Sequence, residues 1–230
     1  KNNIFSLIVD TNGNHVLQKA YSLSRKHGLN FLHEELLKNL IEIAKLKQGA
    51  SVIQKMLEKG DESIKKLISL EIVKSIDKIV NDEYGNFVLQ IIINIKITEI
   101  NEKIYEFLAK NLIELSRKKY SSNVIDKCIL NEDCNFKYRN ILIDAIINSK
   151  LISEIVGDQY GNYVVQKSLQ VSEGFRFMSI IQMIKPCLKS LKYSNHSKKI
   201  YDNLMSHYGE YFCGGGNKRN YSFHKVTKNI

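Results

Sequence analysis

A five-residue pattern that returns at a nearly fixed interval constrains the fold of this chain more than any other feature. Each copy has aliphatic residues at its third and fourth positions, and polar, aromatic or small residues at its first, second and fifth. Successive copies begin 36, 36, 36 and 40 residues apart. Such a period is typical of stacked-repeat proteins. The five copies, called pentads below, span residues 14–18, 50–54, 86–90, 122–126 and 162–166.

We expect each pentad to lie on a helix, because apolar residues between the pentads also recur at helical spacing. On a helix, residues i and i+4 share a face, and residue i+1 projects beside them. Positions one, two and five therefore offer three side chains to one surface. The aliphatic pair points into the stack, because a solenoid repeat cannot bury its apolar face alone. A single pentad would indicate a solvated helix face, but five phased copies favour a repeated binding surface.

Turn residues precede three of the pentads at matching places. Asp10, Asp82 and Asp158 are each followed three residues later by a glycine, and the pentad begins directly after that glycine. Aspartate is a favourable helix N-cap, and glycine permits a tight turn or a close approach between helices. The local signals therefore agree with the global period.

The chain has 230 residues, of which 43% are hydrophobic and 25% are charged, a composition typical of a globular protein. We expect residues 1–212 to form one all-α solenoid of about five repeats, with further repeats preceding residue 1. One period beyond Asn162 falls on Lys198, where helical character persists without the polar triad, so we expect a degenerate capping repeat there. We expect the extra residues of the 40-residue interval to form a loop, and residues 213–230 to form a flexible basic tail.

Charge and composition narrow the classes of partner and exclude several functions. A net charge of +10 and a pI near 9.3 favour a polyanion, either nucleic acid or an acidic membrane surface. The four cysteines form no C-x-x-C pair and have no His-x-x-x-His nearby, which argues against a zinc site. No apolar run approaches the ~18 residues of a membrane span, and no signal peptide is apparent. We therefore expect a cytoplasmic protein without a metal or cofactor, and the scattered histidines indicate no enzyme.

Four segments carry a family resemblance: GNHVLQK at 13–19, YGNFVLQ at 84–90, SSNVIDKC at 121–128 and DQYGNYVVQK at 158–167. They resemble the Pumilio (PUF) family of RNA-binding repeats, and the resemblance extends from residue 4 to about 212. It implies a right-handed, all-helical crescent of three-helix repeats whose inner helices bind single-stranded RNA, one base per repeat. Periodicity alone also allows an armadillo or HEAT-like scaffold.

The resemblance implies a role for each pentad position. Positions one and five contact the Watson–Crick edge of a base, and the side chain at position two stacks between neighbouring bases. The stacking residues would be His15, Ser51, Phe87, Asn123 and Tyr163. Because serine offers little stacking surface, we expect repeat two to make the weakest contact. Lysines follow four pentads, at Lys19, Lys55, Lys127 and Lys167, where they could reach phosphates or cover apolar surface with their stems.

The resemblance also implies a base for each repeat, with the RNA running antiparallel to the chain. In the family, Asn with Gln selects uracil, Ser with Glu selects guanine, and Cys or Ser with Gln selects adenine. Ala50 with Gln54 departs from this pattern; alanine leaves room for adenine but supplies no hydroxyl or thiol. The predicted core is 5′-UGUAU-3′, with uracil at Asn14/Gln18, Asn86/Gln90 and Asn162/Gln166, guanine at Ser122/Asp126 and adenine at Ala50/Gln54.

The function expected from this resemblance is post-transcriptional regulation of mRNA. The chain would act as a monomer that binds 3′ untranslated regions and represses or destabilises messages, with protein co-repressors as further partners. The alternative is a helical protein-interaction or ribosome-assembly scaffold that binds RNA with little base specificity. Membrane binding is a weaker third option, because no apolar stripe with basic flanks is apparent.

Overall fold

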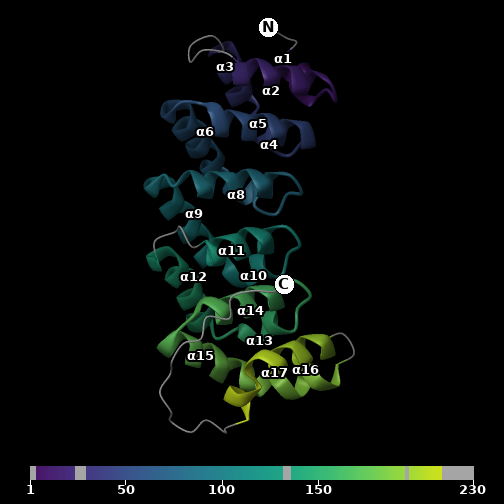
Figure 1. Cartoon of the computed structure of the whole chain (residues 1–230), viewed down its shortest axis with the longest axis vertical. Coiled ribbons are helices and arrows are strands. Elements are labelled where there is room, and N and C mark those ends of the chain that lie inside the picture. The colour runs from purple at the N-terminus through teal and green to yellow at the C-terminus, as the bar shows by residue number, and fades with distance from the viewer. Residues whose placement is uncertain (1–3, 24–29, 132–135, 195–196, 214–230) are drawn as a thin grey trace.

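The computed structural model describes residues 4–23, 30–131, 136–194 and 197–213, and these residues form helices joined by short connections. The helices lie in layers that follow one another along the longest axis of the molecule (Figure 1). Each of the first five layers consists of a short helix, a long helix that carries a pentad and a second long helix. Of the loop predicted at residues 130–135, residues 132–135 lie outside the described residues, as do residues 214–230 of the tail predicted at 213–230.

Corresponding helices recur in every repeat. The short helices are α1 (Ile4–Val9), α4 (Leu40–Ala44), α7 (Ile76–Ile79), α10 (Leu112–Ser116) and α13 (Ile152–Val156). The inner helices, which carry the pentads, are α2 (Gly13–Leu23), α5 (Lys47–Lys59), α8 (Gly85–Ile95), α11 (Ser121–Leu130) and α14 (Gly161–Val171). The outer helices are α3 (Asn30–Lys38), α6 (Glu62–Lys74), α9 (Thr98–Lys110), α12 (Phe136–Ser149) and α15 (Gly174–Ile184). The capping unit consists of η1 (Lys185–Cys187), α16 (Leu188–Tyr193) and α17 (Lys198–Phe212).

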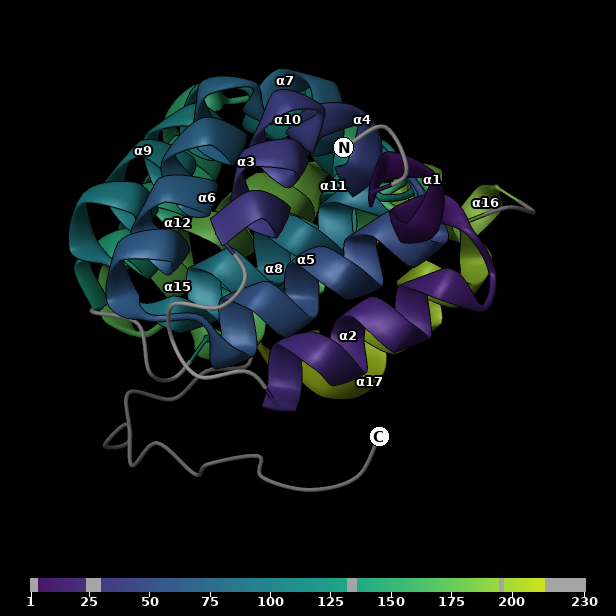
Figure 2. The ribbon, with the colours of Figure 1, turned by 90° about the horizontal axis from the view of Figure 1, so that it is seen from above.

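The inner and outer helices form two separate columns. Each inner helix packs on the inner helix of the next repeat, from α2 through α5, α8 and α11 to α14, and the outer helices α3, α6, α9, α12 and α15 do the same. Seen from above, α2, α5 and α17 lie toward one side of the stack, and α6, α9 and α12 lie toward another (Figure 2). The predicted fold class, a right-handed α-solenoid of three-helix repeats, is confirmed.

The aliphatic pair of each pentad forms the core between successive repeats. In repeats two to five the third- and fourth-position side chains are at most 1% exposed. Val16, the third residue of the first pentad, is 67% exposed, because none of the described helices packs on that side of α2. The same residue type is thus buried or exposed according to whether a neighbouring layer covers it, as expected for a solenoid.

A close backbone contact fixes where each inner helix begins. A Cβ built on Gly13, Gly49, Gly85 or Gly161 would lie 2.1–2.9 Å from the carbonyl oxygen six residues earlier, on the preceding short helix. Repeat four has Ser121 at this place, and its hydroxyl donates to the corresponding carbonyl, that of Leu115, at 2.6 Å. The role predicted for the glycines, close helix approach, is therefore confirmed at the contact between the short and inner helices.

This contact predicts opposite effects for the same substitution at two glycines. In Gly161→Ala the new methyl group meets Ile155 O at 2.8 Å and Ile155 Cβ at 2.9 Å, and such overpacking costs about 1 to 3 kcal/mol. In Gly209→Ala the nearest atom, Met205 Cε, is 3.5 Å away, and the better helix propensity of alanine contributes up to about 1 kcal/mol. Thermal unfolding of the two variants should show a lowered midpoint for the first and an unchanged or raised midpoint for the second. Equal shifts would refute the close contact.

Candidate nucleic-acid interface

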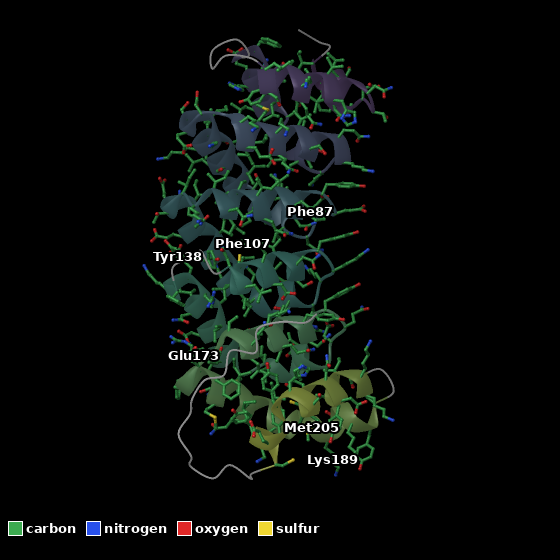
Figure 3. The ribbon with its side chains drawn as sticks, viewed as in Figure 1. Phe87, Phe107, Tyr138, Glu173, Lys189 and Met205 are labelled. Atoms are coloured by element: carbon green, nitrogen blue, oxygen red, sulfur yellow. The ribbon has the colours of Figure 1, made fainter. Side chains whose placement is uncertain are left out.

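The five pentads lie in register on consecutive inner helices, so their polar side chains follow one another along the stack. Figure 3 shows these side chains on the ribbon, with Phe87 of α8 near the middle of the row. Sequence analysis predicts that positions one, two and five share the surface. In the structure, the Asn and Ser side chains at position one are at most 5% exposed. The side chains at position five are half-buried, with the exception of Gln54. At position two, the exposed side chains are His15, Phe87, Asn123 and Tyr163. The surface is therefore a row of projecting second positions above a partly buried polar layer.

In the three Asn–Gln repeats the position-one amide group is held by the backbone. Both Nδ2 hydrogens are donated to carbonyl oxygens four and three residues earlier, in the turn before the inner helix. Oδ1 then accepts a hydrogen bond from Nε2 of the position-five glutamine. That bond is 2.9 Å in Asn14–Gln18, 3.0 Å in Asn86–Gln90 and 2.8 Å in Asn162–Gln166.

This geometry gives the two amides different tasks. An amide group has two donor hydrogens, and the asparagine donates both of them to backbone carbonyl oxygens. After bonding to the asparagine, the glutamine keeps one Nε2 hydrogen and the lone pairs of its Oε1 oxygen, one of which accepts from Asn203 Nδ2 at 3.3 Å in the case of Gln166. It can therefore present an adjacent donor and acceptor to a ligand, and the asparagine fixes its orientation. The Watson–Crick edge of uracil carries a matching N3–H donor beside carbonyl acceptors.

Two aromatic side chains dominate the exposed second positions. Phe87 and Tyr163 are each 55% exposed although both are large and apolar. His15 and Asn123 are also exposed, whereas Ser51 is half-buried and its hydroxyl donates to the Lys47 carbonyl at 3.1 Å. The available stacking surface is therefore largest in repeats three and five, and smallest in repeat two.

Repeat two lacks the preformed amide pair. Ala50 has no oxygen to accept from Gln54, and the Gln54 Nε2 instead donates to Glu58 Oε1 at 2.7 Å. Hydrogen bonds from Gln54 and Lys55 lower the pKa of the Glu58 carboxyl, so this acceptor is charged at neutral pH. Gln54 is exposed and points one turn further along α5 than its counterparts. Glu58 was not apparent from the pentad pattern, although its place four residues after Gln54 is a usual helical pairing distance.

Repeat four replaces the amide pair with a hydroxyl and a carboxyl. Ser122 Oγ donates to the Lys119 carbonyl at 3.3 Å, and Oδ1 of Asp126 is buried with no hydrogen-bond partner among the described residues. Burial raises the pKa of the Asp126 carboxyl to about 6, and the Lys167 ammonium on α14 opposes that rise. Asp126 is thus a half-buried acceptor at the fifth pentad position, with one oxygen fully covered, and it lies near one cation of the next repeat.

In repeats one, three and five, an aspartate side chain secures the turn before the inner helix. Oδ1 of Asp158 accepts from the backbone N–H groups of Tyr160 and Gly161, both at 2.9 Å, and Asp82 and Asp10 make equivalent bonds. The aspartates predicted as caps therefore serve the turn and the first residue of the helix. The same turn supplies the carbonyls that hold Asn162, so the cap also positions the first pentad residue.

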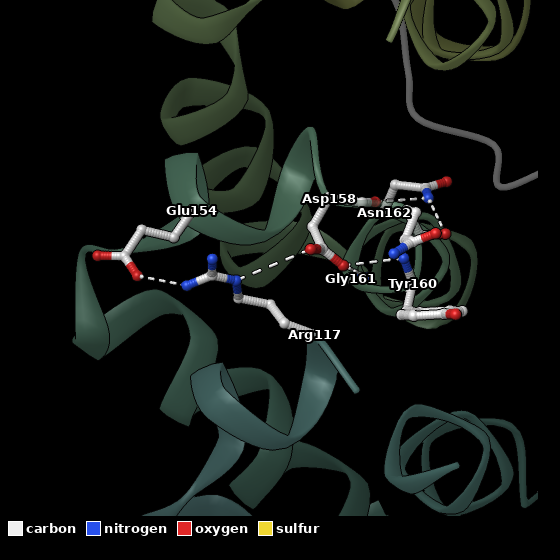
Figure 4. A network of polar contacts seen from close by, with 7 residues as sticks. Arg117, Glu154, Asp158, Tyr160, Gly161 and Asn162 are labelled. Atoms are coloured by element: carbon white, nitrogen blue, oxygen red, sulfur yellow. Dashed lines mark hydrogen bonds and ion pairs between the residues drawn. The ribbon is translucent and has the colours of Figure 1, made fainter. Parts of the chain in front are cut away.

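A residue of the preceding repeat reinforces this turn. Arg117, which follows α10, lies 3.3 Å from Glu154 Oε2 and 3.8 Å from Asp158 Oδ2 (Figure 4). Asn81 lies 36 residues before Arg117, at the corresponding place of the preceding repeat. Its Oδ1 accepts a hydrogen bond from the backbone N–H of Ser121 at 3.3 Å. This contact supports the turn of repeat four, where Lys118 stands in place of the capping aspartate. Neither residue was predicted as part of the site. Their spacing of 36 residues is the signal that could have identified them.

The lysines that follow the pentads differ in their exposure and in their side-chain partners. Lys19 is exposed, whereas Lys55 pairs with Glu58 at 3.0 Å and Lys167 donates to Gln170 at 3.4 Å.

In the part of the chain that the structure describes, no three His, Cys, Asp or Glu side chains gather to hold a metal ion. Among the described helices, none combines the length and the apolar character that a membrane crossing requires.

The capping role of Asp158 predicts a graded loss of stability. Asp158→Ala removes two backbone hydrogen bonds, which should cost about 0.5 to 2 kcal/mol and lower the thermal midpoint by roughly 2 to 4 °C per kcal/mol. Asp158→Asn keeps the accepting oxygen and loses only an exposed ion pair with Arg117, so it should cost less. Asp77→Ala on α7, where the side chain is exposed, is the matched control. A midpoint for Asp158→Ala equal to that of the control would rule out the cap.

Comparison with known proteins identifies a family and several solved structures. The family described as Pumilio-family RNA-binding repeat matches residues 3–24, 40–73, 111–147 and 152–185, and the third pentad lies between two of these segments. Pumilio homolog 12 of Arabidopsis thaliana is 32% identical over 206 residues, covering 90% of this chain and 34% of the relative. Pumilio homology domain family member 4 of Saccharomyces cerevisiae is 31% identical over 221 residues, covering 85% of this chain and 23% of the relative. The chain thus spans about a third or less of the length of these relatives.

Two of the similar structures contain RNA. PUF-8 in complex with PBE-RNA matches with a TM-score of 0.82 and 31% identity, over 90% of this chain and 62% of that one. The Puf4 RNA-binding domain bound to the HO endonuclease RNA 3′ UTR recognition sequence matches with a TM-score of 0.79 and 28% identity, over 87% of this chain and 64% of that one.

Proposed function

Because the chain belongs to the Pumilio family of RNA-binding repeat proteins, we propose that its inner helices bind single-stranded RNA and read one base per repeat. The observation that carries this proposal is the register of the polar layer. On the inner helices α2, α8 and α14, a partly buried hydrogen-bonding pair lies beside an exposed second-position side chain. Single-stranded RNA needs both, because a splayed base has a polar edge and a π-face.

Repeats one, three and five read uracil in this proposal. The glutamine would accept from uracil N3–H with its Oε1 and donate its remaining Nε2 hydrogen to a uracil carbonyl. The asparagine bond preorganises the glutamine before RNA arrives, which reduces the side-chain entropy lost on binding. The readers are Gln18, Gln90 and Gln166, oriented by Asn14, Asn86 and Asn162.

Repeat four reads guanine. Guanine presents its N1–H and exocyclic amine as adjacent donors, and an ionised carboxylate, which only accepts, matches them. Asp126 lies at the fifth pentad position and is half-buried rather than fully covered, so a guanine bound to this repeat would meet its carboxylate. Repeat two reads adenine with the least selectivity, because Gln54 must first leave Glu58. With RNA antiparallel to the repeats, the core is 5′-UGUAU-3′.

At the level of the cell, the proposed function is regulation of mRNA in the cytoplasm by a monomer that recruits protein co-repressors. The 3′ UTR sequence bound by Puf4 supports this assignment by analogy. The alternative function, a scaffold that binds RNA with little base specificity, would account for the solenoid and its positive charge. It would leave unexplained why three repeats build the same amide pair with bonds of 2.8–3.0 Å. A selection from randomised single-stranded RNA distinguishes the two, since a scaffold would enrich no motif.

Stacking on the second positions predicts which side chains contribute most to affinity. Phe87→Ala and Tyr163→Ala should each weaken binding to 5′-UGUAU RNA by about 1 to 3 kcal/mol, the usual contribution of one stacked base. Phe175→Ala is the matched control, because Phe175 is 81% exposed but begins the outer helix α15. Fluorescence anisotropy at fixed salt measures all three. Wild-type affinity in the first two variants would place the RNA elsewhere.

Guanine selection should depend on the ionisation of Asp126. Because the carboxyl has a pKa of about 6, it is largely protonated at pH 5 and ionised at pH 7.5, and only the ionised form accepts both guanine donors. The preference for 5′-UGUAU over 5′-UUUAU should therefore increase across this range. Using the ratio of the two affinities cancels any effect of pH that is common to both RNAs. The same ratio should be insensitive to pH in Asp126→Asn; an identical pH profile in both proteins would exclude this role.

The same group predicts a stability change and a specificity switch. The folded pKa lies above the ordinary aspartate value of 3.8, so the folded state binds the proton more tightly and loses stability as pH rises from about 4 through 6. Asp126→Asn should remove that loss.

Asp126→Glu should keep or improve guanine selection, whereas Ser122→Asn with Asp126→Gln should rebuild the amide pair and favour 5′-UUUAU. A double variant that still prefers guanine would contradict the assignment.

A further inference from the structure

The positive charge of this chain is concentrated at its C-terminal end. Residues 1–173 contain 24 basic and 22 acidic residues, whereas residues 174–230 contain ten basic and two acidic ones. From residue 174 to 201 there are six basic residues and no acidic residue. Residues 1–173 are therefore nearly neutral, and residues 174–230, which include the capping unit, supply most of the net charge.

The lysines of the capping unit are exposed and carry uncompensated charge. Lys189 and Lys192 lie on α16, Lys198 and Lys199 begin α17, and all four are exposed. None of them forms an ion pair within the described residues. By contrast, the outer-helix lysines Lys65, Lys66 and Lys103 pair with Glu62 or Glu99.

The start of α17 repeats a local contact of the inner helices. Ser197 Oγ donates to the Leu191 carbonyl six residues earlier, which is the contact that Ser121 makes with Leu115 in repeat four. Lys198 therefore occupies the first pentad position and Lys199 the second. Asn203 of α17 donates to Gln166 Oε1 at 3.3 Å, which joins the cap to the last reading pair.

The side chains at the pentad places of α17 differ chemically from those of a repeat that reads a base. No amide pair is present at its first and fifth places, which hold Lys198 and Asp202. Lys192 is held between the helices, with its Nζ 5.8 Å from the Tyr193 ring and 6.0 Å from the Tyr201 ring. Tyr201 lies one helical turn from Lys198. A lysine ammonium is a flexible point charge that binds phosphate without reading a base.

We propose that Lys192, Lys198 and Lys199 bind the backbone phosphates of the nucleotides immediately 5′ of the uracil held by Asn162 and Gln166. This inference rests on the proposed function, because an antiparallel RNA places its 5′ side over the cap. The bound RNA would thus extend beyond the five-base core by one or two nucleotides of any sequence. Electrostatic attraction would be strongest at this end of the solenoid.

Flanking extensions of the RNA test the proposal directly. Binding is measured for 5′-UGUAU, for the same core with three adenosines on its 5′ side, and for the core with three adenosines on its 3′ side. We expect the 5′ extension to raise affinity more than the 3′ extension. Three abasic ribose-phosphates on the 5′ side should give the same gain, because the contacts are to phosphate. A gain that requires bases, or equal gains at both ends, would overturn the proposal.

Charge-neutral variants then assign the gain to the cap. Lys198→Gln with Lys199→Gln should abolish the gain from the 5′ extension, and should reduce the slope of log K against log salt by about 1.4, or about 0.7 for each of two contacts. Lys78→Gln with Lys110→Gln removes the same charge from exposed positions on α7 and α9 and is the control. If both double variants lose the gain equally, only net charge matters and the site is refuted.

The same experiment separates this inference from the proposed function. A protein that prefers 5′-UGUAU to 5′-UUUAU but gains nothing from 5′ phosphates retains the base-reading function and lacks the cap site. A protein that binds none of these RNAs at low salt lacks both. Unchanged thermal midpoints of the two double variants show that the lysine substitutions have not altered the fold.

Discussion

Burial of the aliphatic pair between successive inner helices is the constraint on which the rest of this structure depends. The pair is at most 1% exposed wherever a neighbouring layer covers it, and Val16 is exposed where none of the described layers does. Each repeat therefore relies on its neighbour for its apolar core. Because the same pair recurs at the same helical phase, the polar positions beside it also recur in phase. A regular row of ligand-facing groups is thus a consequence of how the stack buries its apolar surface.

The polar layer gains its order from the turns that precede the inner helices. A capping aspartate accepts from the backbone of the turn, the carbonyls of the same turn hold the asparagine, and the asparagine holds the glutamine. Glycine or serine directly before the pentad lets the inner helix approach the preceding short helix. Arg117 and Asn81 extend this arrangement across the repeat boundary. Preorganisation of this kind reduces the free-energy cost of ordering side chains when a ligand binds.

Variation among the repeats follows from small chemical changes in this common framework. Alanine at the first position of repeat two leaves Gln54 to bond with Glu58, so this repeat lacks the oriented amide. An acidic fifth position in repeat four leaves a half-buried carboxyl whose pKa is raised to about 6 by desolvation. The capping unit keeps the helical register at the start of α17 but carries Lys198 and Lys199 at the first and second positions. One scaffold thereby presents amide, carboxyl and ammonium groups at the same geometric place.

The sequence by itself determined the repeat period, the all-helical solenoid, the phase of the pentads and the cap at Lys198, because burial of a periodic apolar pattern admits few other solutions. It also identified the exposed second positions, since residue i+1 must project beside the i and i+4 pair. Only the tertiary structure decided that the position-one asparagines are buried and donate both amide hydrogens to backbone carbonyls. It also decided that Gln54 donates to Glu58. These outcomes depend on which hydrogen-bond partners lie within reach after the chain has folded. The raised pKa of Asp126 and the ties from Asn81 and Arg117 were decided in the same way, because desolvation and contacts between repeats exist only once the layers have stacked.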